Sequence, residues 1–402
     1  MKKRFIFLCY TIALLLLGTF APLRAQLAEE PMEEQPMIGE LASVELHQRS
    51  TTTAWLPDSL EFRSKFLGNL QLSGYLEAYY SLNVQDPESP TQPGYLYSYN
   101  RNNEVNLNLG FVRIAYEDKR IKSNLAFMAG TYANANLAAE EGGLKNVFEA
   151  NIGLKLHARR ELWLEAGIMP SHIGFESAIG RDCWNLTRSL LAENSPYYES
   201  GVKLSYAPEN EVWKASVLLL NGWQRIQRVP GNSLPSFGHQ LMYTPSEKVA
   251  INSSSFIGTD SPDSARRMRY FHNFYTTAQI SPKIGVTAGF DIGLQQSSKG
   301  SSDYNTWYSP VLIVQYKPSG KFSMATRTEY YSDKYGVIVS TSAMDGFQMM
   351  GFSINADYNV NENAVLRLEA RNFRPWTNSL EPATTENMEP LLLTTSLAIS
   401  LR

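Results

Sequence analysis

Two segments near the C-terminus alternate arginine and glutamate at every second position. Arg327 is followed by Glu329, and a later segment contains Arg367, Glu369 and Arg371. Residues two apart on an extended chain lie on the same face, so each segment would present its charges as one strip. Such a strip could orient hydrated solutes and select ions. The alternative is a ladder of ion pairs that only solvates a wall, because ion pairs usually contribute little stability.

A second charged set lies in the longest connection between regular segments, residues 170–198. Its charges of both signs are on Glu176, Arg181, Asp182 and Arg188. If the chain forms a wide barrel, an unobstructed interior would be an aqueous channel. We therefore predict that this loop folds into the interior as a constriction, where its mixed charges favour dipolar, hydrated solutes. The alternative is a surface loop with one helical turn.

Enzymatic chemistry has little support in the sequence. The five histidines show no metal-binding spacing, and no G-x-S-x-G or H-E-x-x-H motif occurs. A hydrolase within a barrel would need a serine and a histidine at one membrane level beside an orienting group. Ser171 and His172 are only neighbours within a loop. We predict no catalytic residues, no metal site and no cofactor.

The segments that must position these charges alternate apolar and polar residues. The clearest runs from Leu70 to Val84, and the same pattern recurs over residues 284–295, 364–371 and 391–401. A period of two residues is typical of β-strands with two different faces. Seven short turns and eight long polar connections separate these segments. Together they predict about 16 strands.

Tyrosines recur just before the short turns, several of them in a Tyr-x-Pro pattern. Proline suits a turn because it fixes φ and would break a central ladder. The interpretation as an aromatic girdle at a membrane interface competes with ordinary tyrosines at strand ends. The girdle residues are Tyr116, Tyr206, Tyr243, Tyr316 and Tyr358.

Alternation alone cannot distinguish a membrane barrel from a soluble barrel or sandwich. Soluble strands usually span about five or six residues, whereas the first strand here alternates over the whole stretch from Leu70 to Val84. The regular exchange of short and long connections is typical of an outer-membrane barrel. We therefore predict an all-β, transmembrane antiparallel up-and-down β-barrel with short periplasmic turns and long external loops. The apolar phase slips between Val105 and Val112, which predicts a β-bulge.

Composition excludes other classes of protein. The mean hydropathy is -0.27, and beyond residue 20 no apolar run is long enough for a helical membrane span. The apolar and aromatic content is too high for a mostly disordered chain. An exported, soluble β-rich binding protein stays as an alternative.

The N-terminal residues resemble an export signal. Lys2, Lys3 and Arg4 precede an apolar stretch, and Ala25 offers a small residue for cleavage. We predict a signal peptide at 1–25, a flexible acidic leader at 26–66 and the barrel at 67–402; the alternative for the first segment is an anchor helix. After cleavage Cys183 would be the single cysteine, so no intramolecular disulfide could form. The net charge would fall from -3 to -7, which is unlike a nucleic-acid-binding protein.

Several short motifs between residue 70 and the end resemble one family. They are Gly167-Ile168-Met169-Pro170 with Gly174-Phe175-Glu176, Asn221-Gly222-Trp223, Tyr243-Thr244-Pro245, and the Arg-x-Glu segments at 327 and 367. In order and spacing they resemble the OmpL-like putative β-barrel porins of outer membranes. The resemblance implies a pore-forming barrel without assigned enzymatic activity, substrate or catalytic residues.

We therefore expect an outer-membrane porin of a Gram-negative bacterium that allows passive diffusion of small hydrophilic solutes. The alternative is a substrate-specific or plugged barrel that acts in transport or surface binding. The expected partners are outer-membrane lipid, the outer-membrane assembly machinery and small hydrophilic solutes. Homo-oligomerisation is left open, and no nucleic acid is expected.

Overall fold

The computed structural model describes residues 67–210, 212–341, 343, 345–376 and 389–401. The predicted signal peptide and acidic leader lie outside these residues. Within the described ranges, no helix is long and apolar enough to cross a membrane.

Sixteen strands make up the wall. They are β1 (Leu70–Asn83), β2 (Glu104–Glu117), β3 (Ile121–Ala129), β4 (Val147–Lys155), β5 (Glu161–Pro170), β6 (Tyr198–Ala207), β7 (Trp213–Leu220), β8 (Ser236–Ser246), β9 (Val249–Gly258), β10 (Arg269–Ser281), β11 (Ile284–Gln296), β12 (Tyr304–Tyr316), β13 (Phe322–Asp333), β14 (Phe347–Asn359), β15 (Ala364–Pro375) and β16 (Leu391–Leu401). The described long connections carry the short helices α3 (Thr131–Asn136), η1 (Gly142–Asn146), η2 (Gly180–Asp182), α4 (Leu190–Glu193) and η3 (Asp263–Ala265).

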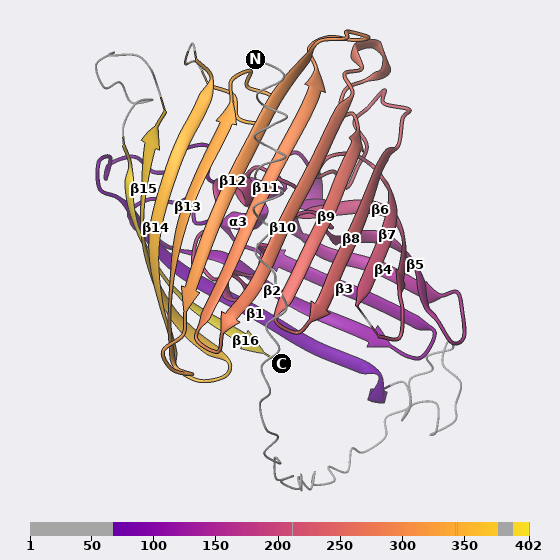
Figure 1. Ribbon diagram of the computed structural model, residues 1–402, viewed down its shortest axis with the longest axis horizontal. Coiled ribbons are helices and arrows are strands. Elements are labelled where there is room, and N and C mark those ends of the chain that lie inside the picture. Colours follow the sequence, from indigo (N-terminus) through magenta and orange to yellow (C-terminus); the bar gives the residue numbers. More distant parts are fainter. Residues whose placement is uncertain (1–66, 211, 342, 344, 377–388, 402) are drawn as a thin grey trace, which may run out of the picture. The chain divides into compact units, whose positions relative to one another are not determined.

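The strands pair in sequence order, and β1 pairs with β16, so the barrel is closed (Figure 1). At this seam the strands are antiparallel, with Gly74 opposite Leu401 and Asn83 opposite Leu392. The hydroxyls of Ser81 and Thr394 add a side-chain hydrogen bond of 2.8 Å across it. Short turns and long connections alternate from β1 to β16. The predicted sixteen-strand antiparallel barrel is confirmed.

Side chains of each strand alternate between a buried inner face and an exposed outer face. On β15, Leu366 and Leu368 are 49% and 57% exposed. Arg367, which lies between them, and Glu369, which follows Leu368, are each 1% exposed. Most of the other strands also expose large apolar side chains on the outside. A soluble monomer rarely exposes so much contiguous apolar surface, whereas a lipid-facing wall requires it.

The predicted bulge is confirmed in β2. Between β1 and β2 the register shifts, because Glu77 lies opposite Leu109 and Ala78 lies opposite Leu107. Asn108 is the extra residue, and its side chain turns into the barrel. There its amide donates to Glu77 Oε2 at 3.2 Å and its oxygen accepts from the Tyr99 backbone N–H at 3.1 Å. The bulge thus aims a polar side chain at an inward-folded connection.

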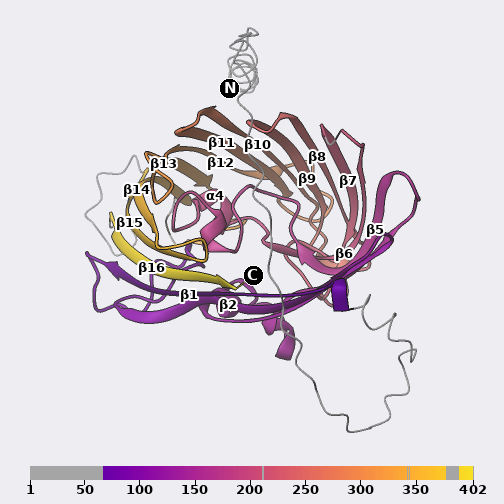
Figure 2. The same ribbon diagram turned by 90° about the horizontal axis from the view of Figure 1, so that it is seen from below.

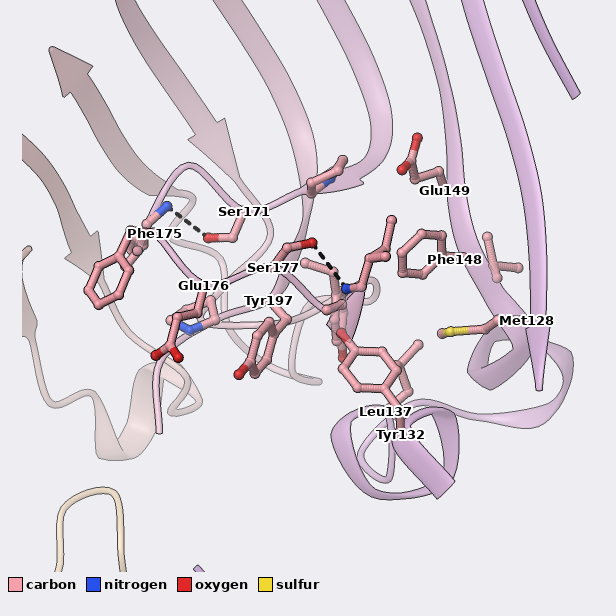
Figure 3. Close-up of a pocket in the computed structure, with 18 of the residues that line it drawn as sticks. Met128, Tyr132, Leu137, Phe148, Glu149, Ser171, Phe175, Glu176, Ser177 and Tyr197 are labelled. Atoms are coloured by element: carbon pink, nitrogen blue, oxygen red, sulfur yellow. Dashed lines mark hydrogen bonds between the residues drawn. The ribbon is translucent and has the colours of Figure 1, made fainter. Parts of the chain in front are cut away.

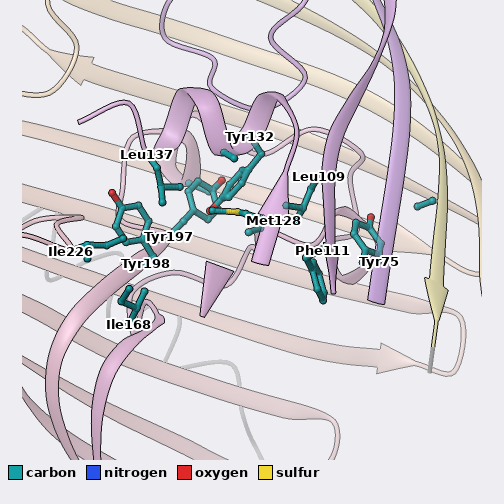
Figure 4. Close-up of a cluster of buried hydrophobic side chains, with 14 of the residues drawn as sticks. Tyr75, Leu109, Phe111, Met128, Tyr132, Leu137, Ile168, Tyr197, Tyr198 and Ile226 are labelled. Carbon is teal, nitrogen blue, oxygen red and sulfur yellow. The ribbon is translucent and has the colours of Figure 1, made fainter. Parts of the chain in front are cut away.

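The long connections are part of the folded interior. Figure 4 shows a buried apolar cluster in which Leu109 and Met128 of the wall meet Tyr132, Leu137 and Tyr197 of the connections. These side chains are between 0% and 8% exposed. Because apolar burial is a dominant stabilising contribution, the connections are held against the wall by the same force that stabilises a soluble core.

A charge placed on the outer face tests its assignment to lipid. Ile354 is 44% exposed and lies four residues from the rim tyrosine Tyr358 on β14. We expect Ile354→Arg to destabilise the barrel in lipid vesicles by about 2–4 kcal/mol, the cost of arginine near the bilayer centre. Urea unfolding monitored by heat-modifiable gel migration measures this. Asn363→Arg at an exposed position of the adjacent turn is the control; an equal effect of both changes would contradict the lipid-facing assignment.

Candidate functional site

The connection between β5 and β6, residues 171–197, folds into the barrel, and Figure 2 shows its helix α4 inside the ring of strands. We call this segment the lumen loop. It reaches strands on the opposite side of the ring, where α4 packs against β12 and β13. The Leu190 N–H donates to Glu329 Oε2 at 2.6 Å, and the Leu186 N–H donates to Asn355 Oδ1 at 3.1 Å. The loop therefore spans the interior.

Ion pairs on β13 and β15 receive the lumen loop. Glu329 contacts Arg327 at 3.2 Å and Arg371 at 2.7 Å, and Arg327 also contacts Glu369 at 3.0 Å. Arg367 pairs with Asp357 of β14 at 2.8 Å. Because each strand places alternate residues inward, three neighbouring strands bring these charges onto one part of the inner wall. We call these ion pairs together the anchor network.

Thr187 is the part of the loop that the anchor network holds most closely. Its backbone N–H donates to Glu369 Oε2 at 2.6 Å, and its carbonyl accepts from Arg327 at 2.6 Å. Its hydroxyl accepts from Arg327 at 3.0 Å and from Arg371 at 3.3 Å. One residue thus makes four hydrogen bonds to charged groups. Charge-assisted bonds are stronger than neutral ones, so Thr187 fixes the position of the loop.

The predicted pore-lining charges face inward, but they do not border open water. Arg327, Glu329, Arg367, Glu369 and Arg371 are 0–2% exposed because the lumen loop covers them. Arg367, for example, donates to the backbone carbonyls of Gly180 at 2.5 Å and Cys183 at 2.9 Å. In this structure they are anchors for the loop. A role for them in selecting solutes stays a prediction.

Two of the four predicted constriction residues stabilise the loop itself. Glu176 accepts from the backbone N–H and the hydroxyl of Ser189, and it lies 3.8 Å from Arg327. Arg188 donates to the carbonyls of Ser177 at 2.6 Å and Leu186 at 2.7 Å. Both side chains are buried. They shape the loop and do not present their charges to water.

The other two constriction residues lie at the edge of the loop. The Arg181 backbone N–H donates to the Tyr75 hydroxyl at 3.3 Å, and its guanidinium donates to the Glu362 carbonyl in the β14–β15 turn. Asp182 is exposed. Of the predicted loop charges, these two are therefore the ones that water reaches.

Glycines on the inner wall make room for the loop. A Cβ added at Gly285 would lie 2.7 Å from the Trp184 ring, and one at Gly289 would lie 2.7 Å from the Phe175 ring. At Gly238 it would lie 2.7 Å from His172 Nε2. These distances are too short for real side chains. The wall and the loop therefore have complementary shapes, with bulky loop residues docking where the wall has none.

His172 and Ser171 do not form a catalytic pair. His172 Nδ1 lies 2.8 Å from Glu199, and its Nε2 lies 2.8 Å from the Ser255 carbonyl oxygen, so both ring nitrogens are engaged. The Ser171 hydroxyl points to Glu199 instead, at 3.4 Å. Burial opposes protonation of the ring, but the Glu199 carboxylate outweighs it and raises the pKa of His172. The group is a buried ion pair that ties the loop to the wall.

The lumen loop also binds the connection between β1 and β2. Glu193 accepts from the backbone N–H groups of Tyr97 at 2.8 Å and Ser98 at 3.1 Å. Burial raises the pKa of Glu193 to about 7, although these two donors and the nearby Arg371 and Arg188 oppose the shift. This contact therefore titrates near neutral pH.

Partly exposed ion pairs lie on the opposite wall, and their residues were not among those predicted from the sequence. Arg113 of β2 pairs with Glu149 of β4 at 2.5 Å, and Glu165 of β5 joins Lys122 at 3.0 Å to Lys203 at 3.1 Å. Their side chains are 8–27% exposed. Each of these charged residues has at least one apolar residue beside it in its strand, and this pattern could have indicated an inward-facing charge. They form no repeating Arg-x-Glu motif, however.

The contact between Lys122 and Glu165 depends on a glycine between them. Gly153 of β4 lies between Lys122 and Glu165 in the register. A Cβ there would lie 2.8 Å from Lys122 Cε and 3.3 Å from Glu165 Cγ. The glycine lets the two long side chains meet across β4.

The five girdle tyrosines lie at or near the short-turn ends of their strands. Tyr206, Tyr316 and Tyr358 are 40%, 45% and 48% exposed. Tyr243 stacks on Trp213 of β7 with ring centroids 4.1 Å apart. Tyr116 is partly exposed. The arrangement has the geometry of an aromatic rim, and its function at a membrane interface stays a prediction.

Comparison with known families gives one match that spans the barrel. A family model described as "Putative beta-barrel porin-2, OmpL-like" matches residues 69–401. No curated protein matches the chain.

Solved structures with a similar fold have very different sequences. An anion-selective porin from Comamonas acidovorans is 7% identical, with a TM-score of 0.52 over 83% of this chain and 99% of that chain. OmpT of Vibrio cholerae in a trimer form is 9% identical, with a TM-score of 0.52 over 82% and 98%. Salmonella typhi OmpF, in complex with daunomycin, is 10% identical, with a TM-score of 0.53 over 83% and 97%. At these identities the likeness concerns the fold.

The anchor network predicts how the loop responds to a lost charge. Arg327→Met leaves Glu369 without its arginine partner beneath the loop, and an unpaired buried charge costs about 3–5 kcal/mol. We expect the loop to leave its site so that water reaches the carboxylate. Limited proteolysis of the folded protein should then cut within residues 171–197. Adding Glu369→Gln should restore part of the protection; equal cleavage of wild type and Arg327→Met would contradict the anchoring role.

The Glu193 contact predicts a dependence on pH. A carboxyl whose pKa is raised from 4.5 to about 7 stabilises the folded contact fully below pH 4.5 and loses this contribution as the pH rises through 7. The raised pKa of His172 acts in the same direction. We expect the loops to separate more often at pH 8 than at pH 5, which raises single-channel conductance. Glu193→Gln, which cannot ionise, should show a smaller change; an unaltered pH profile in this variant would contradict the assignment.

Proposed function

This chain belongs to the OmpL-like putative β-barrel porin family, as its sequence motifs indicated, and on that premise we propose how its interior conducts. It is an outer-membrane porin. In our proposal small hydrophilic solutes diffuse passively through a water-filled passage between the lumen loop and the wall formed by β2 to β6. The observation that carries the proposal is the lumen loop, which crosses the barrel and is held by the anchor network on β13 to β15.

The exposure of the charged side chains on the two walls supports this position of the passage. On the loop side, the anchor charges are 0–2% exposed. On the β2–β6 side, the charged side chains of Arg113, Lys122 and Lys203 are 24–27% exposed and are accompanied by Glu149 and Glu165. Of these two sets of charges, the set on the β2–β6 wall therefore has the greater contact with water. Because both signs of charge are present, dipolar and hydrated solutes would be favoured over a single class of ion.

The same proposal covers cellular context. A signal peptide at 1–25 would direct export and be cleaved, the acidic segment 26–66 would precede the barrel, and the assembly machinery of the outer membrane would insert it. Outer-membrane lipid would surround the apolar wall, with the tyrosine rim at the interface. The trimer form of Vibrio cholerae OmpT supports a homo-oligomer for this fold. Family and fold point to a non-enzymatic channel.

One observation favours the second candidate, a barrel that is plugged or specific for a ligand. The connections β3–β4 and β7–β8 are hydrogen-bonded to each other. Glu140 accepts from the Ile226 backbone N–H at 2.8 Å and from the Tyr198 hydroxyl at 3.2 Å, and Gln224 donates to the Asn136 carbonyl at 3.1 Å. If these contacts do not open, free diffusion would be blocked.

Conductance in planar bilayers distinguishes the two candidates. Wild-type protein should show steady, ohmic current. Replacing residues 173–195 with a short Gly/Ser linker should raise the conductance severalfold, because the loop occupies the centre of a barrel that would otherwise be an aqueous channel.

The control replaces the connection between β11 and β12, residues 297–303, which lies outside the lumen loop. It should leave the conductance unchanged. Absence of current from wild type together with current from the loop-deleted protein would favour the plugged barrel. No rise in conductance after deletion would refute the constriction.

A further inference from the structure

A cavity of about 460 Å³ lies between the first half of the lumen loop and the inner wall of β2 to β5 (Figure 3). In Figure 3, Met128, Phe148 and Glu149 lie along the wall, whereas Phe175, Glu176 and Tyr197 belong to the loop. The volume falls in the range of about 300–1,000 Å³ typical of small-molecule sites. The cavity is on the side of the loop that faces away from the anchor network.

Aromatic rings border the cavity on both sides. On the wall, Phe148 stacks on Phe111 with ring centroids 4.7 Å apart and planes at 18°, and Phe111 in turn stacks on Tyr75 at 5.9 Å. Phe111 and Tyr75 are buried, whereas Phe148 is partly exposed. On the loop side, Phe175 is supported by Tyr275 at 5.4 Å. The stacked rings form a rigid platform that suits the apolar face of a ring-shaped solute.

The charges at the cavity are already balanced. Arg113 and Glu149 form an ion pair of 2.5 Å, and the Arg113 guanidinium lies 5.3 Å and 6.0 Å from the centroids of Phe111 and Phe148. Glu176 lies 3.8 Å from Arg327 on the other side of the loop. No lining charge is left for a solute to neutralise. A neutral solute therefore fits better than an ion.

Two residues at the cavity carry a buried polar atom without a hydrogen-bond partner among the described residues. They are Arg113 Nε and the Tyr197 hydroxyl. The first can only donate, whereas the second can donate and accept. Unpaired buried polar atoms are rare and costly, so each requires an explanation. A cation could not serve the guanidinium, whereas the hydroxyl groups of a solute can accept from Arg113 and can exchange a hydrogen bond with Tyr197.

We propose that this cavity is a subsite for a neutral saccharide ring. The ring stacks on Phe148 with its apolar face, and its hydroxyls bind Arg113 Nε and the Tyr197 hydroxyl. The inference rests on the proposed passage, because a solute reaches the cavity through it. With this subsite the porin would select solutes by binding as well as by size, since solutes with such a ring would bind briefly during passage.

The test compares two neutral polyols in planar bilayers. Methyl glucoside has a ring, whereas mannitol has a similar set of hydroxyls on an open chain. With potassium chloride carrying the current, we expect methyl glucoside to reduce conductance saturably and mannitol to reduce it only through viscosity. Equal, non-saturating effects of the two polyols would overturn the proposal.

Variants assign the effect to the cavity. Phe148→Ala should raise the half-blocking concentration of methyl glucoside about tenfold, as expected for a lost stacking contact. Tyr197→Phe should raise it about threefold, because only one hydroxyl is removed. Trp163→Ala, another inward aromatic residue that does not line the cavity, is the matched control and should retain wild-type block. Equal block in Phe148→Ala and wild type would overturn the assignment.

Failure of the proposed passage is distinguishable from failure of the subsite. If wild-type protein carries no current, the passage is refuted, and equilibrium dialysis of labelled methyl glucoside against detergent-solubilised protein then tests the subsite. Retention that Phe148→Ala weakens would support the site; no retention would overturn it. If the protein conducts but methyl glucoside behaves like mannitol, the porin stands and the subsite does not.

Discussion

The interior of this barrel depends on one interaction, the contact between the lumen loop and the buried ion pairs of β13 and β15. Arg327, Glu329 and Arg371 satisfy one another, and their remaining hydrogen-bonding positions are filled by Thr187 and its neighbours. A buried ion pair gains little net stability, because desolvation offsets attraction. What it provides is position, since a displaced loop would lose its hydrogen bonds to several charged groups at once. The network therefore selects one placement of the loop.

This placement makes the interior asymmetric. The wall from β8 to β11 has glycines where loop side chains dock, such as Gly285 beneath Trp184, and the wall from β13 to β15 is covered by the loop backbone. The wall from β2 to β6 instead retains side chains such as Lys122 and Lys203 in contact with water. The lumen loop thus divides the interior into a side where loop and wall are packed together and a side where the wall is in contact with water. The two sides have different chemistry although both consist of inward-facing strand residues.

Much of this fold can be predicted from the sequence, because strand periodicity is a local property. The alternation from Leu70 onward and the rhythm of connections predict sixteen strands, and the slip near Val112 predicts the bulge at Asn108. The site is harder to predict. Alternation indicates that Arg367 points inward, but whether water or another segment covers it depends on a loop with no period of its own. The partly buried Glu165 could not be identified because its partners, Lys122 and Lys203, come from strands β3 and β6.

The closure of β1 on β16 has a consequence for the order in which the molecule can form. The hydrogen bond between Ser81 and Thr394 joins residues 313 positions apart, so the first strand keeps a free edge until the last strand has been made. The lumen loop has the same dependence on late residues, because Thr187 precedes Arg327 and Arg371 by more than a hundred positions. Unpaired strand edges favour aggregation, and long-range pairing is slow. The chain must therefore be kept apart from its copies until synthesis is complete, and the loop can be locked in place only in the final stage of assembly.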